Sequence, residues 1–121
     1  MLTLSRLPAD APHRELAARR GADLSSLWRE HDHRNSRLAK ALADADAGVL
    51  QMRFEAKAVV KRRLTRRLTR HALNGSTVQP NMIESRVALP FQWLTYTTVL
   101  AELLARDSGA ALVEWTLLEK P

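Results

Sequence analysis

A tandem repeat in the middle of the chain is the strongest constraint on its fold. Residues 63–66 read Arg-Leu-Thr-Arg, and residues 67–70 repeat the same four letters. An α-helix turns by about 100° per residue, so a four-residue repeat drifts by only about 40° per copy. This places Val60, Leu64 and Leu68 in one apolar seam, with the arginines on the opposite side. The repeat therefore predicts a long amphipathic helix with its leucines inside and a cationic outer face.

The positive charge of the chain is concentrated around this repeat. Seven of the 19 lysines and arginines lie between residues 57 and 71, with no acidic residue among them. The remaining 12 are outnumbered by 13 acidic residues, so the rest of the chain has a net charge of −1 while the whole chain has +6. A local cationic face fits a polyanionic partner, because each neutralised phosphate releases condensed counterions. The predicted nucleic-acid-binding residues are Lys57, Lys61, Arg62, Arg63, Arg66, Arg67 and Arg70.

Several of these arginines would repel one another along the helix. Arg62 and Arg66, Arg63 and Arg67, and Arg66 and Arg70 are each four residues apart, which costs about 0.2–0.5 kcal/mol per pair. Phosphate groups would supply the missing negative charge, and the planar guanidinium binds them in a bidentate manner. The run contains no asparagine or glutamine that could read base edges. We therefore expect contact with the nucleic-acid backbone rather than sequence-specific recognition, with RNA, DNA and a hybrid all left open.

Other interpretations of the basic run stay open. Basic residues are favoured near a helix C-terminus by the helix dipole, and this run precedes the stop signal at Leu73-Asn74-Gly75. Acidic residues elsewhere in the fold, or on a protein partner, could also neutralise it. The alternatives are thus a phage- or plasmid-encoded interaction or inhibitor protein, and a free-standing non-specific DNA-binding protein.

Length and composition predict one soluble domain spanning residues 1–121. No cysteine is present, so disulfides and thiolate metal sites are excluded, which fits a reducing cytoplasm. No apolar run approaches the roughly 20 residues of a membrane span, and the first residues lack the features of a secretion signal. Alanine and arginine are abundant and β-branched residues are few, a composition that favours helices. We therefore expect a cytoplasmic protein that does not bind membranes.

The pattern along the chain predicts an all-α fold, a compact bundle of four to six helices. After an irregular lead-in at 1–11, a short helix at 13–20 would be closed by Gly21, and Asp23 would cap the next one. Apolar residues spaced by three and four then predict one long helix or two stacked helices over 24–74. Residues 76–82 are the predicted internal loop. Further helices are expected at 81–88, 91–106 and 110–119.

Candidate sites for chemistry are weaker. His31 and His33 are separated by about 200° on a helix and cannot share one metal ion, so His31 is expected near the core and His33 outside. The chain has no glycine-rich phosphate loop and no evident catalytic pair, so we predict neither enzyme activity nor a metal or cofactor. Helical spacing favours core packing over base stacking for the aromatic residues. These are Trp28, Phe91, Trp93, Tyr96 and Trp115.

The C-terminal third resembles a known family. Residues 84–94, Glu-Ser-Arg-Val-Ala-Leu-Pro-Phe-Gln-Trp-Leu, lead into Val-Leu-Ala-Glu-Leu-Leu-Ala-Arg at 99–106. This is similar to the Leu-Pro-led helix of the small helical subunits of CRISPR effector complexes, particularly the type III kind, in which a terminal helix carries an aromatic residue, as Trp115 would here. The sequence departs from that pattern at 93–97, where the family often has an asparagine-glycine pair.

The resemblance implies a non-catalytic subunit of a larger ribonucleoprotein. Several copies would stack along a guide RNA and support the guide–target duplex or the displaced strand. The implied partners are therefore RNA or DNA, other protein subunits, and further copies of this chain.

Overall fold

The computed structural model describes residues 11–42 and 44–120, so the predicted lead-in lies outside the described residues apart from Ala11. Four helices, four strands and a short 3-10 helix occupy this part of the chain. In order they are α1 (Ala11–Arg20), α2 (Leu24–Lys40), β1 (Ala47–Glu55), α3 (Ala58–Arg70), β2 (Gly75–Gln79), β3 (Met82–Pro90), η2 (Phe91–Trp93), α4 (Leu94–Ser108) and β4 (Ala111–Leu118).

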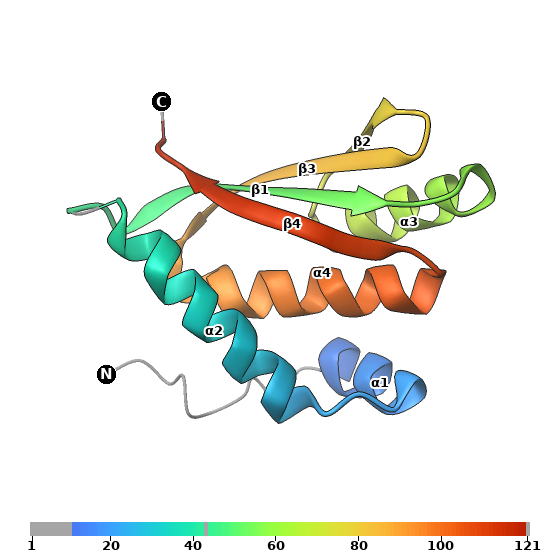
Figure 1. The fold of residues 1–121 in the computed structure, drawn as a ribbon, viewed down its shortest axis with the longest axis horizontal. Helices are drawn as coiled ribbons and strands as arrows, with labels where there is room; N and C mark the ends of the chain where they lie inside the picture. Colours follow the sequence, from blue (N-terminus) through green and yellow to red (C-terminus); the bar gives the residue numbers. More distant parts are fainter. Residues whose placement is uncertain (1–10, 43, 121) are drawn as a thin grey trace.

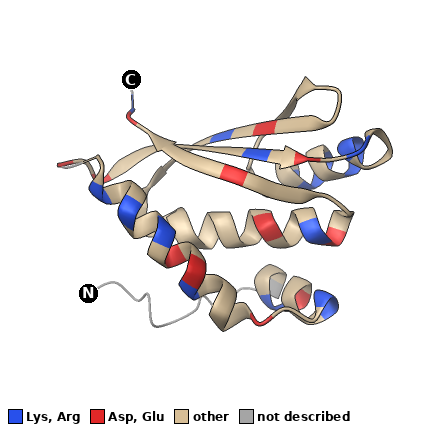
Figure 2. Cartoon of the chain, viewed as in Figure 1, with Lys and Arg blue, Asp and Glu red and all other residues tan. Residues whose placement is uncertain are grey.

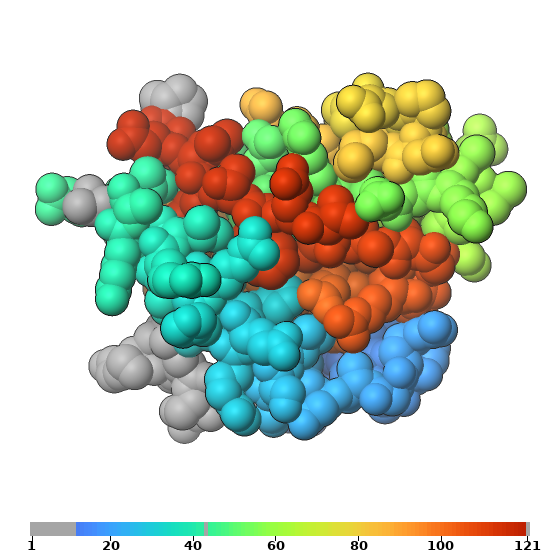
Figure 3. Space-filling model, in the orientation of Figure 1, coloured from blue at the N-terminus to red at the C-terminus, as the bar shows by residue number. Residues whose placement is uncertain are grey.

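The strands form one antiparallel sheet in the order β2-β3-β1-β4. From β1 to β4 the chain follows a β-α-β-β-α-β path, the ferredoxin-like arrangement, with α1 and α2 added in front. The helices lie on one side of the sheet, with α4 running beneath it (Figure 1). In the space-filling view, α2 and β4 meet on the visible face (Figure 3). The Arg34 guanidinium of α2 donates to the Trp115 carbonyl of β4 at 3.3 Å.

The prediction of an all-α bundle is therefore wrong. The expected helix over 24–74 is interrupted by strand β1, and the expected loop at 76–82 is mostly strand β2, leaving only a turn at Pro80 and Asn81. The segments at 81–88 and 110–119, both expected to be helical, lie mainly in β3 and β4. Only α1, α2, α3 and α4, which lie on one side of the sheet, are helical as predicted.

The apolar residues of β1 fit both a helical and a strand period, and the prediction used the helical one. Val49 and Met52 continued a spacing of three and four, but the buried residues Leu50, Met52 and Phe54 alternate with more exposed ones. Such alternation indicates a strand with one buried face. In β3 the same period is hidden because the buried Ser85 breaks the apolar row; its hydroxyl donates to the carbonyl of Leu73.

Other sequence predictions are confirmed. Helix α1 ends before Gly21, whose φ of +64° suits glycine. The Asp23 side chain caps α2 by accepting hydrogen bonds from the backbone of Ser25 and Ser26. After η2, helix α4 occupies most of the predicted 91–106 segment. His31 is buried and His33 is exposed, as expected.

The core lies between the sheet and the helices, and it sets the orientation of α3. Leu64 and Leu68 are completely buried, which confirms the predicted seam, and Val60 packs against the same core at its edge. Strand β2 passes close to this helix at Gly75, where an added Cβ would lie 3.0 Å from a Leu68 methyl group. Leucine burial therefore holds the opposite face of α3 toward solvent.

Candidate nucleic-acid interface

Helix α3 presents a crest of basic side chains to solvent. With about 100° of rotation per residue, Arg66 lies almost opposite the Leu64–Leu68 seam, and Arg62 and Arg70 lie about 40° to either side of Arg66. All three arginines are exposed. Val59, at 87% the most exposed large apolar side chain among the described residues, is on the same crest. The sequence prediction that arginines face outward is thus confirmed for Arg62, Arg63, Arg66 and Arg70, whereas the Arg67 side chain is only 22% exposed.

The structure distributes the seven predicted basic residues over the crest and both flanks of α3. Lys57 is exposed at the N-cap, and Lys61 lies on the flank that faces β2. Arg63 and Arg67 lie on the opposite flank, where both contact Ser108 at the end of α4. Only Arg67 forms an ion pair with another described residue. The basic residues outside any ion pair in the described part are Lys57, Lys61, Arg62, Arg63, Arg66 and Arg70.

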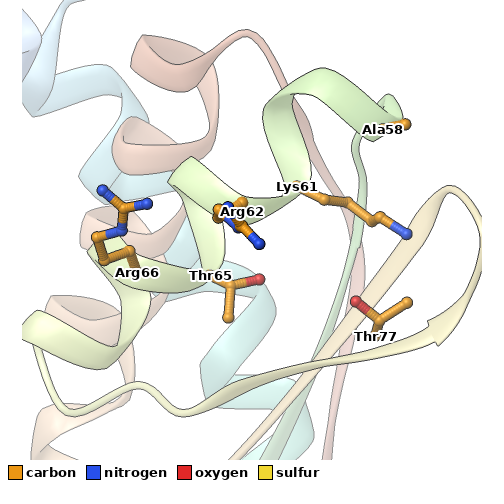
Figure 4. A pocket seen from close by; sticks show the side chains of 6 residues that line it. All are labelled: Ala58, Lys61, Arg62, Thr65, Arg66 and Thr77. Carbon is orange, nitrogen blue, oxygen red and sulfur yellow. The ribbon is translucent and has the colours of Figure 1, made fainter.

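One hollow, of about 720 Å³, lies between α3 and β2. Its lining residues are Ala58, Lys61, Arg62, Thr65, Arg66 and Thr77, and we call it the β2-side hollow. Figure 4 shows the Lys61 side chain extending toward Thr77 on the strand, with Arg66 at the other end of the helix segment. Cationic groups and hydroxyl donors suit phosphate oxygens, and no aromatic ring lines this hollow for a base to stack on.

A second hollow, of about 400 Å³, lies on the other flank of α3. It is lined by Arg19, Arg63, Arg66, Arg67, Arg70 and Asp107, and we call it the α1-side hollow. Arg66 lines both hollows, so the cationic surface is continuous across the helix. With five arginines and one aspartate, the α1-side hollow carries a formal charge of +4 (five minus one).

Asp107 organises the arginines of the α1-side hollow. Its carboxylate lies 2.7 Å from a guanidinium nitrogen of Arg19, 3.0 Å from one of Arg67 and 4.0 Å from one of Arg20. Burial raises the pKa of Asp107, but the hydrogen bond from Arg67 and the charges of Arg19 and Arg67 outweigh it, so the pKa lies below its usual value. Asp107 therefore stays ionised and holds arginines from α1 and α3 side by side.

His71 follows the helix as its C-cap and belongs to the same electrostatic field. Its partial burial, followed by the charges of Arg67 and Arg70, lowers its pKa below the ordinary 6.5. The ring is therefore mostly neutral near neutral pH. Burial is the larger cause of this shift, and the positive charges of Arg67 and Arg70 at this end of α3 add to it.

Sequence reasoning missed the residues that other elements contribute. Arg19, Asp107 and Ser108 come from α1 and α4, and Thr77 comes from β2. No local pattern linked them to the basic run, since 88 positions separate Arg19 from its partner Asp107. Thr65, by contrast, could have been predicted from the sequence. It follows Lys61 by four residues and Arg62 by three, and residues at these spacings are neighbours on a helix surface.

The open face of the sheet is a poor candidate for the same role. Arg53 on β1 stands directly between Glu84 on β3 and Glu114 on β4, at 3.3 and 3.5 Å, and both signs of charge are visible on these strands in Figure 2. Antiparallel four-stranded sheets of the RNA-recognition type stack bases on aromatic residues. The outward positions of β1, β3 and β4 include no aromatic residue.

The aromatic and ionisable residues elsewhere serve mainly the interior. Trp28 and Trp115 are buried, as predicted, whereas Trp93 is 47% exposed and the prediction of core packing is wrong for it. His31 lies 2.7 Å from a Glu102 oxygen and 2.8 Å from the Thr98 hydroxyl, in a polar network between α2 and α4. Within the described residues, no group of three or more potential ligands is arranged to hold a metal ion. None of the described helices combines the length and apolar character needed to cross a membrane.

The structure also corrects the fold implied by the family resemblance. The segment before Pro90, read as a helix, is strand β3, and Trp115 lies on strand β4 rather than on a terminal helix. Two of the three helical features on which the resemblance rested are therefore absent from the described residues. No family model, curated protein or solved structure matches the chain.

Proposed function

We propose that this chain binds the sugar-phosphate backbone of a nucleic acid through α3 and catalyses no reaction on it. The observation that carries the proposal is a basic helix whose crest and two flanking hollows hold cationic side chains in excess of acidic ones. Asp107 is the single acidic side chain among the described residues that pairs with α3. The other basic groups on this helix have no protein partner of opposite charge in the described part.

Charge balance supports a polyanion as the missing partner. Repulsion between successive turns of arginine costs about 0.2–0.5 kcal/mol per pair, and the fold accepts it at several positions. Phosphates would remove this cost and release counterions, each phosphate contact contributing about 0.9 to the slope of log affinity against log salt on duplex DNA. Both hollows offer guanidinium groups, and the β2-side hollow adds threonine hydroxyls.

Charge reversal on the crest tests the proposal. The variant Arg62→Glu/Arg66→Glu/Arg70→Glu should lose nucleic-acid binding, measured by fluorescence anisotropy, while circular dichroism shows that the fold persists. The matched control reverses the exposed residues Arg29, Arg37 and Lys40 on α2, which changes the net charge by the same amount. Undiminished affinity of the crest variant, or an equal loss in the control, would contradict a role for α3.

The wider role as a subunit of a ribonucleoprotein, with several copies along a guide, stays a prediction. With β3 and β4 in place of two expected helices, the family resemblance lends it little support. Affinity purification with and without nuclease distinguishes it from the rival interaction protein. Partners that disappear after nuclease treatment favour nucleic-acid binding, whereas an acidic protein that stays bound favours the rival.

A further inference from the structure

The shape of the cationic surface carries more information than its charge. α3 forms a ridge, with Arg62, Arg66 and Arg70 along its crest and one hollow on each flank. The β2-side hollow is bounded beyond the helix by Thr77 of β2, and the α1-side hollow by Arg19 of α1. Each flank of α3 therefore carries its own set of cationic or hydroxyl groups, and Arg66 on the crest joins the two sets.

Two such sets on either side of one helix match the width of a DNA groove. An α-helix with its side chains is about 10–12 Å across, and the 13 residues of α3 extend for about 20 Å. The major groove of B-DNA is about 12 Å wide and is bordered by one phosphate backbone on each side. A ridge with cationic flanks therefore offers one flank to each strand.

Other nucleic acids fit this shape less well. Proteins that bind single strands stack bases on aromatic side chains, and neither hollow is lined by an aromatic residue. The major groove of A-form RNA is deep and narrow, so protein side chains cannot read it. A ridge-shaped cationic helix would have to bind duplex RNA from outside, with one flank unused.

We propose that the polyanion is a B-form DNA duplex and that α3 lies in its major groove; this rests on the proposed function. Lys61, Thr65 and Thr77 then contact phosphates of one strand. Arg19 and the crest residue Arg70, which both line the α1-side hollow, contact the other strand. The other two crest arginines, Arg62 and Arg66, point into the groove, where guanine presents N7 and O6 as acceptors.

Competition between defined probes tests this inference. Affinities are measured at one fixed salt concentration for a DNA duplex, an RNA duplex of the same sequence, and a single DNA strand with the same number of phosphates. We expect the DNA duplex to bind at least about tenfold more tightly than either alternative. Equal or weaker binding of the DNA duplex would overturn the inference yet leave backbone binding intact. Failure to bind any of the three would overturn both.

Chemical protection locates the groove. Bound protein should reduce dimethyl sulfate methylation of guanine N7, which lies in the major groove, and netropsin, a minor-groove ligand, should not displace the protein. Unprotected N7 or displacement by netropsin would overturn major-groove binding.

Single substitutions on the two flanks test whether both strands are contacted. Lys61→Ala and Arg70→Ala should each reduce the steepness of log affinity against log salt concentration by about 0.9 on the DNA duplex. Arg37→Ala on α2 is the control and should leave the slope unchanged. A change in slope for only one of the two flank variants would overturn the two-strand geometry.

Discussion

At the scale of single residues, Asp107 has two opposing effects, on stability and on binding. Its side chain is 7% exposed and joins Arg19 to Arg67. Asp107→Asn should lower the free energy of unfolding by about 1–3 kcal/mol, because charged hydrogen bonds are lost and arginines are left uncompensated. The same change removes the one carboxylate among the described residues that line the α1-side hollow, so affinity for nucleic acid should rise.

Denaturant titration and anisotropy on the same samples separate these effects. Glu15→Gln, on the exposed side of α1, makes the same change in net charge away from any described ion pair and serves as the control. A folded Asp107→Asn protein with weaker binding would show that Asp107 shapes the site rather than merely reducing its charge.

His71 provides a pH signal for the same surface. Its pKa is held below 6.5 by partial burial and by Arg67 and Arg70. A bound phosphate near the ring would favour the protonated form, so binding raises this pKa and takes up a proton. Affinity should therefore increase as the pH falls from the bound-state pKa toward the free-state pKa. The effect should be below about tenfold, since one pKa unit corresponds to 1.36 kcal/mol.

The difference between wild type and His71→Gln isolates this contribution across a pH series. Other groups titrate in the same range, so only the difference between the two profiles is informative. Parallel profiles would mean that the bound phosphates lie away from the end of α3.

At the scale of elements, the contact between β1 and β4 depends on Gly48. A Cβ built on this residue would lie 2.8 Å from the Leu118 carbonyl oxygen and 3.2 Å from a ring carbon of Phe91. The carbonyl belongs to the backbone and cannot turn aside, so β4 would have to shift. Gly48→Ala should destabilise the fold by about 1–3 kcal/mol, as overpacking does elsewhere. Thermal unfolding measures the loss of stability. An unchanged unfolding midpoint would show that β4 can shift without a cost in stability.

Elements with locally encoded signals were predictable, and the sheet was not. The repeat around Leu64 and Leu68 specified α3 because its charge and apolar seam repeat within one turn. Asp23 and Gly21 marked helix ends through local capping chemistry. Strands β3 and β4 depend instead on pairing with β1, residues far apart in sequence. The buried row of β3 is interrupted by Ser85, and the alternation in β4 is interrupted by a register shift opposite Arg53 and Phe54. The tertiary pairing therefore decides a conformation that the local pattern leaves ambiguous.

The candidate site was likewise predictable only in part. The seven basic residues were identified because they cluster between residues 57 and 71 without an acidic residue, and helical spacing places the five arginines away from the leucine seam. The two hollows need β2 and α1 to be folded back against α3, so Thr77 and Arg19 could not be linked to the helix from sequence. Asp107 likewise has its partners on other elements, and only the packing of α4 against α1 and α3 brings it next to Arg19 and Arg67.

At the scale of the whole molecule, a polar network fixes the position of α2. Asn35 accepts a hydrogen bond from the Trp115 indole at 2.8 Å and donates to the hydroxyl groups of Thr95 and Thr98. Trp115 in turn stacks against His31, with ring centroids 4.6 Å apart. These contacts join α2 to both α4 and β4. Because buried polar groups are costly when unpaired, the network favours a single packing of α2.

Two carboxylates on α4, Glu102 in this polar network and Asp107 at the basic surface, make the fold sensitive to acid. Burial raises the pKa of Glu102, but its hydrogen bond to His31 and the charges of His31 and Arg106 outweigh it, so the pKa lies below 4.5. The pKa of Asp107 similarly lies below 3.8. The unfolded chain therefore binds protons more readily than the folded one. Both ionised groups stabilise the fold at pH values above their pKa in the unfolded chain. This stabilisation is lost as the pH falls through their pKa in the folded protein.

The free energy of unfolding should accordingly decrease between about pH 5 and pH 3. The double variant Glu102→Gln/Asp107→Asn should be less stable than wild type at neutral pH and should show a shallower decrease. Urea titrations at a series of pH values measure both slopes. The comparison uses the slope of the free energy of unfolding against pH. It therefore stays informative even if the double variant is much less stable than wild type. Identical slopes would place the acid sensitivity in carboxylates other than Glu102 and Asp107.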